Sequence, residues 1–255
     1  MKKCYLQNKT VVISGASGGI GFSVAKMLIE KFNCKIIGIA RNEKKILSAI
    51  ETLGDKKSNF SYKIFDVSIR ENWKNFAKEL SDTNTKIDVL INNAQASASG
   101  VTIEKHTTEQ FNLAMYSGLY ATFYYMQACY PYLKETKGSV INFASGAGLF
   151  GNYGQCSYAA AKEAIRGLSR VAATEWGKDG INVNVVCPLA WTAQLEQFKM
   201  AYPDAFDKNV HMPPMGHFGD SEYEIGRVCV QLANPDFKYM TGETITLEGG
   251  LGLRP

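Results

Sequence analysis

The sequence of 255 residues lacks the features of several protein classes. No apolar run approaches the roughly 20 residues that a membrane-spanning helix needs, so we expect no membrane segment. The net charge is only +4 and the basic residues are scattered, which argues against a nucleic-acid partner. The first residues contain no apolar core of a signal peptide, so we expect no secretion signal.

Cysteine and histidine are few and widely spaced. The six cysteines include no C-x-x-C pair, and scattered cysteines in a chain of this size favour reduced thiols and a cytoplasmic location. The three histidines are too far apart in sequence to suggest a metal site, so we expect no bound metal. Hydrophobic residues make up 45% of the chain and charged residues 20%, which is typical of a globular protein.

Strand-like and helix-like segments alternate along the chain, without a repeat or a linker. This alternation predicts an α/β fold with a parallel sheet and helices on both faces, in a single domain over residues 1–255. Strands are expected at about 10–14, 35–40, 60–65, 87–91, 138–144, 181–187 and 243–247. Helices are expected at about 19–31, 42–53, 70–82, 107–134, 154–178 and 221–233.

Residues 10–21, T-V-V-I-S-G-A-S-G-G-I-G, form a β-branched run that breaks into glycines before a helical pattern. A strand, a glycine-rich turn and a helix are the context of a dinucleotide-binding site. Gly15 would permit the tight turn, Gly19 the approach of a pyrophosphate, and Gly21 close packing of helix on strand. The phosphates would then lie at the helix N-terminus. The alternative is an ordinary glycine-rich turn.

A second motif places Tyr158 four residues before Lys162 in an alanine-rich, helix-favouring stretch, with Ser145 thirteen residues upstream of the tyrosine. Side chains four apart lie on one helix face. A nearby ammonium in a dry pocket can lower a tyrosine pKa from about 10 by about three units, at about 1.36 kcal/mol per unit. Taken alone, this pair is a weak signal, because a solvated lysine one turn from a packed tyrosine is the commoner arrangement.

Together the two motifs resemble the short-chain dehydrogenase/reductase family, over essentially all 255 residues. The N-N-A at 92–94, the Asp66–Val67 pair and the segments 215–225 and 241–250 also match the family pattern. The resemblance implies a doubly wound Rossmann-type sheet of about seven strands. It implies cofactor contacts at Gly15, Ser17, Gly19, Ile20, Gly21, Arg41, Asp66, Val67, Asn93, Ala94, Tyr158, Lys162, Pro188 and Thr192.

The preferred nucleotide depends on the end of the second strand. An NAD enzyme usually carries an acidic residue there for the ribose 2′-hydroxyl, whereas an NADP enzyme offers an arginine to the 2′-phosphate. This chain has Ala40 followed by Arg41, which by resemblance implies NADP(H) rather than NAD(H). The alternative is a surface arginine at a strand end. Lys44 and Lys45 would add positive potential.

The resemblance also implies the chemistry. Tyr158 would protonate a carbonyl oxygen in reduction and accept the proton in oxidation, with Ser145 bonded to the same oxygen. Lys162 would lower the Tyr158 pKa and bind the nicotinamide ribose. We therefore expect an NADP(H)-dependent oxidoreductase that moves hydride between nicotinamide and a ketone or secondary alcohol.

The surroundings of this trio depart from the family pattern at three places. Gly118 stands where the family often has an asparagine that contacts the lysine through a water, so the proton relay behind Lys162 must differ, and water filling the space is one way. Gln95 stands where the family has glycine, and its amide would narrow the pocket or bind substrate. Pro188 is followed by Leu189 rather than glycine, with Thr192 one residue early.

A segment over residues 190–220 shows no clean periodicity and, by resemblance, covers the substrate as a lid. Substrate-lining candidates are Gln95, Ser145, Ala147, Leu149, Tyr153, Leu189 and Trp191, with Phe198, Met212 and Met215 in the lid. This apolar lining favours a bulky substrate such as a steroid or another polycyclic compound. The alternative is that these side chains only pack the lid.

Two other functions are compatible with parts of the sequence, and the resemblance also implies an oligomeric state. A non-catalytic nucleotide-binding sensor is favoured by Gly118. A sugar epimerase or dehydratase needs a substrate domain that the residues after 190 are too few to form. By resemblance we expect a homotetramer, or otherwise a dimer. The aromatic residues Tyr120, Phe123, Tyr124 and Tyr125 fit either a subunit interface or the core.

Overall fold

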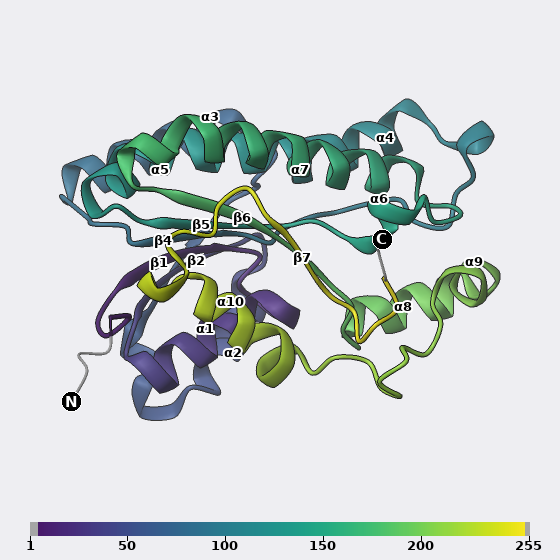
Figure 1. Ribbon diagram of the computed structural model, residues 1–255, viewed down its shortest axis with the longest axis horizontal. Coiled ribbons are helices and arrows are strands. Elements are labelled where there is room, and N and C mark those ends of the chain that lie inside the picture. Colours follow the sequence, from purple (N-terminus) through teal and green to yellow (C-terminus); the bar gives the residue numbers. More distant parts are fainter. Residues whose placement is uncertain (1–4, 253–255) are drawn as a thin grey trace.

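The computed structural model describes residues 5–252 and contains one seven-stranded parallel sheet between two helical layers (Figure 1). The strand order is β3-β2-β1-β4-β5-β6-β7, which confirms the doubly wound α/β fold. The strands are β1 (Thr10–Ser14), β2 (Lys35–Ala40), β3 (Phe60–Ile64), β4 (Val89–Asn92), β5 (Ser139–Phe143), β6 (Asn182–Pro188) and β7 (Thr244–Leu247).

Each face of the sheet is covered by long helices (Figure 1). One face carries α3 (Arg70–Asp82), α4 (Thr108–Ala114), α5 (Ala121–Thr136) and α7 (Cys156–Trp176); the other carries α1 (Gly19–Phe32), α2 (Glu43–Glu51) and α10 (Arg227–Leu232). Every residue of β4 and β5 is buried, as a sheet covered on both faces requires. Two apolar cores result, one on each side of the sheet.

The strand order reverses between β1 and β4, which are paired at Val11↔Val89 and Ile13↔Ile91. Chain leaving β1 turns to one face and chain leaving β4 to the other, so a crevice opens at their carboxyl ends. Ligands bind at such a switch point in open α/β sheets. The glycine-rich turn after β1 and the N-N-A segment after β4 therefore meet at this edge.

The helix expected over 107–134 is interrupted. It consists of α4, a π-helical segment (Met115–Tyr120) and α5. A π-helical turn inside an α-helix frequently marks a functional position, and this one contains Gly118. Tyr125 is buried to 1% exposure, which assigns it to the core. Tyr120 and Phe123 remain exposed.

The segment over 190–220 contains two helices where no periodic pattern was found, α8 (Ala193–Ala201) and α9 (Pro203–Asn209). The Thr192 hydroxyl accepts from the Leu195 amide and caps α8. Pro203 stands at the first position of α9, where its missing N–H costs nothing. Sequence analysis also missed the short α6 (Gly146–Phe150).

The remaining short elements are 3₁₀ turns and one further π-helical turn. They cover Gly54–Asn59, Ile103–Lys105, Gly177–Asp179 and Pro235–Phe237 (3₁₀) and Ser221–Gly226 (π). None of the helices within residues 5–252 is long and apolar enough to cross a membrane. The five cysteines in this range form no disulfide with one another, and no cluster of three metal-ligating side chains occurs in it.

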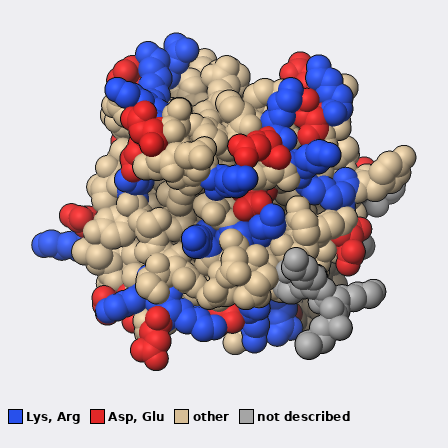
Figure 2. Space-filling model, turned by 90° about the vertical axis from the view of Figure 1, so that its left-hand side faces the viewer, with Lys and Arg blue, Asp and Glu red and all other residues tan. Residues whose placement is uncertain are grey.

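The edge where the strands begin is viewed in Figure 2, from the left-hand side of Figure 1. Basic and acidic side chains are interspersed there. Pairs such as Lys9–Asp88 at 2.7 Å and Lys134–Asp179 at 2.9 Å explain part of this mixture. The candidate site lies at the opposite edge, where the strands end.

Candidate active site

The turn after β1 has the geometry of a phosphate-binding loop. Gly15 (φ +70°) and Gly19 (φ +53°) adopt left-handed conformations, which favour glycine. A Cβ on Gly21 would lie 2.4 Å from the Gly15 carbonyl oxygen, so only glycine allows α1 to approach the turn. Gly18 caps α1 without a side-chain hydrogen bond, and the first turn of α1 has no acidic residue. Its unpaired amides and the helix dipole suit a pyrophosphate.

Ser14 ties this turn to the chain that leaves β4. Its buried hydroxyl accepts hydrogen bonds from the amides of Asn93 and Ala94, both at 3.0 Å. The Asn93 side chain donates back to the Ser14 carbonyl at 3.2 Å and to the Gly15 carbonyl at 3.4 Å. These hydrogen bonds hold the two segments that flank the switch point in a fixed position relative to each other. Ser17 lies in the turn itself and Ile20 in the first turn of α1.

Arg41 leaves the end of β2 with its side chain 60% exposed and one guanidinium nitrogen 3.9 Å from the Asp66 carboxylate. Burial would raise the Asp66 pKa, but hydrogen bonds from the Ser68 hydroxyl and amide, with the Arg41 charge, outweigh it and lower the pKa. Lys45 lies over the glycine turn, because its Cε is 3.2 Å from a Cβ built on Gly18. Arg41 and Lys45 therefore place two positive charges beside the glycine turn. Next to Asp66, the Val67 carbonyl accepts a hydrogen bond from the Trp73 indole at 2.8 Å.

Ser145, Tyr158 and Lys162 come together at the ends of β5 and β6. Ser145 follows β5 and caps α6, accepting from the Ala147 amide at 3.2 Å. Tyr158 and Lys162 lie in the first two turns of α7, and the Lys162 ammonium is 5.5 Å from the centre of the Tyr158 ring. Lys162 is only 4% exposed and donates to the Phe143 carbonyl at 2.7 Å.

Burial dominates the titration of this pair. It lowers the pKa of Lys162 to about 8 and raises the pKa of Tyr158, although a hydrogen bond from the Ser145 hydroxyl partly offsets the rise for the tyrosine. In the protein as described, the pKa of Tyr158 is therefore raised, because desolvation outweighs the Ser145 hydrogen bond. Its lowering by Lys162 stays a prediction. Sequence analysis also missed Cys187, a buried thiol on β6 that interacts electrostatically with both groups.

Gly118 and Gln95, noted separately in the sequence, are neighbours. A Cβ built on Gly118 would lie 2.5 Å from the Gln95 Oε1. The space beside Gly118, which water was one way to fill, is therefore filled by the glutamine amide. The contact explains why a residue without a side chain is needed at position 118.

The lid residues cover this edge of the sheet. Tyr202, at the junction of α8 and α9, packs so closely that a Cβ on Gly100 would lie 2.3 Å from its ring. Asn209 makes two hydrogen bonds to the Tyr153 backbone, accepting from its amide at 2.8 Å and donating to its carbonyl at 2.7 Å. These contacts join the lid to the loops after β4 and before α7.

Some of the predicted substrate-lining side chains are packed inside the protein and others are exposed. Leu149 packs on Ala144, Val185 and Cys187 and belongs to a small core cluster. Trp191 is 41% exposed, and its ring lies 5.1 Å from that of Phe218 and 6.2 Å from that of Phe206. Phe198 packs within the lid, whereas Tyr153, Met212 and Met215 are exposed. The apolar surface available to a ligand therefore comes from Trp191 and the exposed lid residues.

Pro188 ends β6, and Leu189 continues the pairing by donating its amide to the Leu247 carbonyl at 2.9 Å. The Leu189 carbonyl accepts from the Gly219 amide at 3.1 Å, which fixes the far end of the lid. Thr192 uses its hydroxyl oxygen as the cap of α8, and its hydroxyl hydrogen is left to donate to a bound ligand.

Residues 9–201 match the model of the short chain dehydrogenase family. The chain belongs to this family. It is 57% identical over 257 residues to a 12alpha-hydroxysteroid dehydrogenase of a Clostridium species, covering 97% of this chain and 98% of the relative. It is 30% identical to a 3-oxoacyl-[acyl-carrier-protein] reductase of Vibrio harveyi, covering 96% and 98%. The crystal structure of Cj0485 dehydrogenase superposes with a TM-score of 0.86 at 25% identity, covering 99% and 97%.

Membership of the short-chain dehydrogenase family makes the protein an oxidoreductase that acts on a CH–OH or C=O group with a nicotinamide nucleotide. The switch-point crevice described above is the place where the fold would hold that nucleotide. The glycine turn, the uncapped α1 N-terminus and the two cations beside it fit such a group.

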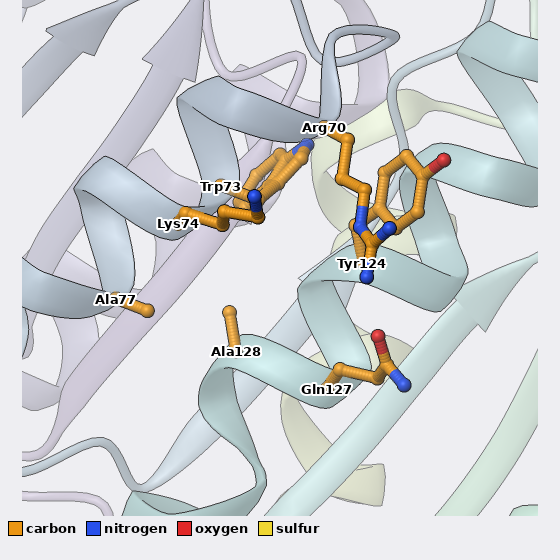
Figure 3. Close-up of a pocket in the computed structure, with 7 residues that line it drawn as sticks. All are labelled: Arg70, Trp73, Lys74, Ala77, Tyr124, Gln127 and Ala128. Carbon is orange, nitrogen blue, oxygen red and sulfur yellow. The ribbon is translucent and has the colours of Figure 1, made fainter.

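A cavity of about 180 Å³ lies elsewhere, between α3 and α5. Figure 3 shows Arg70, Trp73, Lys74 and Ala77 on one helix and Tyr124, Gln127 and Ala128 on the other. None of these residues belongs to the predicted site.

Proposed function

We propose that this short-chain dehydrogenase is an NADP(H)-dependent hydroxysteroid dehydrogenase that interconverts a 12α-hydroxyl and a 12-ketone. The observation that carries the proposal is the 57% identity, over nearly the full length of both chains, to an enzyme named for that activity. The grouping of Ser145, Tyr158 and Lys162 beside an exposed apolar surface supports it.

Tyr158 is the proposed general acid and base. In oxidation it accepts the proton of the substrate hydroxyl, and in reduction it returns that proton to the carbonyl oxygen. Ser145 donates a hydrogen bond to the same oxygen and orients it. The bound nicotinamide supplies or accepts the hydride. Positioned proton transfer of this kind contributes about 10²–10⁴-fold to the rate.

The proposed role of Lys162 is to stabilise the deprotonated, phenolate form of Tyr158 by its positive charge. Its ammonium is held near the tyrosine by the Phe143 carbonyl, which takes one of its three hydrogens and leaves two for the nucleotide ribose and solvent. Because burial alone raises the Tyr158 pKa, the proton transfer depends on Lys162 remaining charged during turnover. With a pKa of about 8, Lys162 is mostly charged at neutral pH.

The proposed preference for NADP(H) rests on Arg41 and Lys45. Arg41 is exposed beyond Ala40, where an acidic side chain would repel a 2′-phosphate, and Lys45 reaches over the glycine turn. A planar guanidinium binds phosphate through paired hydrogen bonds, and a lysine adds a point charge.

A steroid substrate agrees with the apolar side chains at the mouth of the site. Trp191 and the exposed Met212 and Met215 offer a flat, adaptable apolar surface to a rigid ring system. Gln95 adds one polar group to an otherwise apolar wall. A few polar groups in an apolar pocket fix the orientation of a ligand.

Assembly as a homotetramer, with a dimer as the alternative, remains part of the proposal. Tyr116, Tyr120 and Phe123 lie exposed along the π-helical segment and α5, with the rings of the two tyrosines stacked at 5.0 Å. An exposed aromatic row of this kind is typical of an interaction surface.

A panel of alcohols and ketones tests the proposal. The purified protein would be supplied with NADP⁺ and bile-acid-type steroids that carry a single hydroxyl at position 3, 7 or 12, and with sugars and short hydroxy acids as controls. Turnover confined to the 12α-hydroxyl supports the proposal. Turnover of sugars or short acids with little turnover of steroids contradicts it. Nucleotide binding without turnover of any compound favours the alternative, a non-catalytic sensor.

A further inference from the structure

The space beside Gly118 is shared between two distant parts of the chain. A Cβ on Gly118 would lie 2.5 Å from the Oε1 and 2.8 Å from the Nε2 of Gln95. Contacts this short do not occur in proteins, so a side chain at position 118 and a glutamine at position 95 exclude one another. The amide of Gln95 occupies the position that a polar side chain projecting from residue 118 would otherwise take.

The chain next to Gln95 is hydrogen-bonded to the π-helical segment through Ser117. The Ser117 hydroxyl accepts from the Ala96 amide at 3.0 Å and lies 2.6 Å from the Leu113 carbonyl, to which it donates. The side chain of Gln95 also donates, from Nε2 to the Ala114 carbonyl at 3.4 Å. Of the two ends of the amide, only the NH₂ group can donate to a carbonyl, so this contact fixes which end is the oxygen.

The amide oxygen of Gln95 is buried and has no hydrogen-bond partner among the described residues. A buried acceptor without a donor is costly, so natural proteins nearly always supply one. Lys162 lies on α7, the helix that packs against the π-helical segment carrying Gly118, and its ammonium bonds to the Phe143 carbonyl at the end of β5. Its ammonium has two further hydrogens to donate.

We propose that Gln95 is a positioning residue for Lys162: its amide oxygen accepts a hydrogen bond from a water that the Lys162 ammonium holds. This inference rests on the proposed role of Tyr158 as acid and base. The acceptor keeps Lys162 charged in a buried place, and the charge in turn stabilises the Tyr158 phenolate. The glycine at position 118 is the condition for this arrangement, since it leaves room for the amide.

Two other titratable groups face Lys162, namely Tyr158 on α7 and Cys187 on β6. With Tyr158 as the proposed base, the rate of alcohol oxidation rises with pH as Tyr158 loses its proton, a loss that the Lys162 charge favours. Loss of the Gln95 oxygen would favour neutral Lys162 and weaken its help to the phenolate. The rising limb of kcat/KM would then move to higher pH.

The test uses three variants of the full-length protein. Gln95→Met keeps the length of the side chain and removes the acceptor. Gly118→Asn introduces the clash described above. The double variant Gln95→Gly with Gly118→Asn removes the clash and returns an amide oxygen to the same space. For each, the pH dependence of 12α-hydroxysteroid oxidation would be measured beside the Kd for NADPH and the midpoint of thermal unfolding.

The expected result is that Gln95→Met moves the rising limb of kcat/KM up by about half to one pH unit, the size expected for one hydrogen bond. The Kd for NADPH should stay within about twofold, since the Gln95 side chain contacts Gly118 and Ala114 on the helix side and, among the described residues, makes no hydrogen bond with the glycine turn. The double variant should return the limb toward its original position. A limb that does not move in Gln95→Met, or that is not restored in a folded double variant, overturns the inference. If the double variant does not fold, Gln95→Met decides alone.

Tyr158→Phe separates this inference from the proposed function. If that variant keeps full turnover, Tyr158 is not the acid and base and the proposed mechanism fails. If Tyr158→Phe loses turnover while Gln95→Met keeps an unchanged pH profile, only the role of Gln95 is wrong.

Discussion

Replacing Arg41 by alanine is expected to weaken NADPH binding by about 10- to 30-fold and to leave NADH binding unchanged. Hydrogen bonds to charged groups contribute about 1.5–3 kcal/mol each. The Arg41 side chain is 60% exposed, so solvent screening places its contribution at the low end, about 1.5–2 kcal/mol. Each 1.4 kcal/mol corresponds to a tenfold change in Kd. The effect should decrease in higher salt, because the pair is exposed.

Fluorescence titration with both nucleotides measures this prediction directly. Lys44→Ala is the matched control, since it removes an exposed positive charge next to Lys45 without removing the group that lies over the glycine turn. Equal losses for NADPH and NADH in Arg41→Ala would show that the variant damages the site in general. Tighter binding of NADH by the unaltered protein would refute the assignment of Arg41 as the 2′-phosphate ligand.

Three further changes test other parts of the site. Gly21→Ala should abolish tight nucleotide binding in titration and lower the free energy of unfolding by about 1–3 kcal/mol, because its Cβ has no space; unchanged binding would contradict the close approach of α1. Lys162→Met should raise the free energy of unfolding at pH 7 by as much as about 3 kcal/mol, since burial lowers the lysine pKa from 10.5 to about 8. That gain should fade between pH 8 and pH 10.5, where the lysine of the folded protein is already neutral and that of the unfolded chain is still charged. A gain independent of pH in denaturant titrations would contradict it. Asn209→Ala should raise the KM for the steroid several-fold with little change in the Kd for NADPH, because it removes two hydrogen bonds that hold the lid to Tyr153. An unchanged KM would mean that the lid does not depend on this contact.

The strand–turn–helix arrangement at residues 10–32 was predictable because its determinants are local. The strand, the turn and the helix over 10–32 are consecutive in sequence, and the tight contact at Gly21 involves a residue only six positions away. The same holds for the sheet, since a buried parallel strand needs a short apolar run bounded by turn residues. The bounds of the first two strands match the predicted ones, and those of the other five differ by at most two residues.

The parts that sequence analysis missed depend on contacts between distant residues. Gly118 and Gln95 were each recognised as unusual, but their contact spans 23 positions, and no pattern in either segment indicates it. The raised pKa of Tyr158 depends on burial supplied by several elements. The lid helices are short, and α8 has no buried residue to produce a periodic pattern. Their signals were the capping Thr192 and the initiating Pro203.

The most direct test of the proposed function is the oxidation of a 12α-hydroxysteroid with NADP⁺ by the unaltered protein and by Tyr158→Phe. The phenylalanine variant keeps the ring and removes only the group that moves the proton. We predict measurable NADPH formation by the unaltered protein and a loss of about 10²–10⁴-fold in kcat in the variant, with the Kd for NADPH retained. Equal rates for the two proteins, or no steroid turnover by the unaltered protein at saturating NADP⁺, would contradict the account.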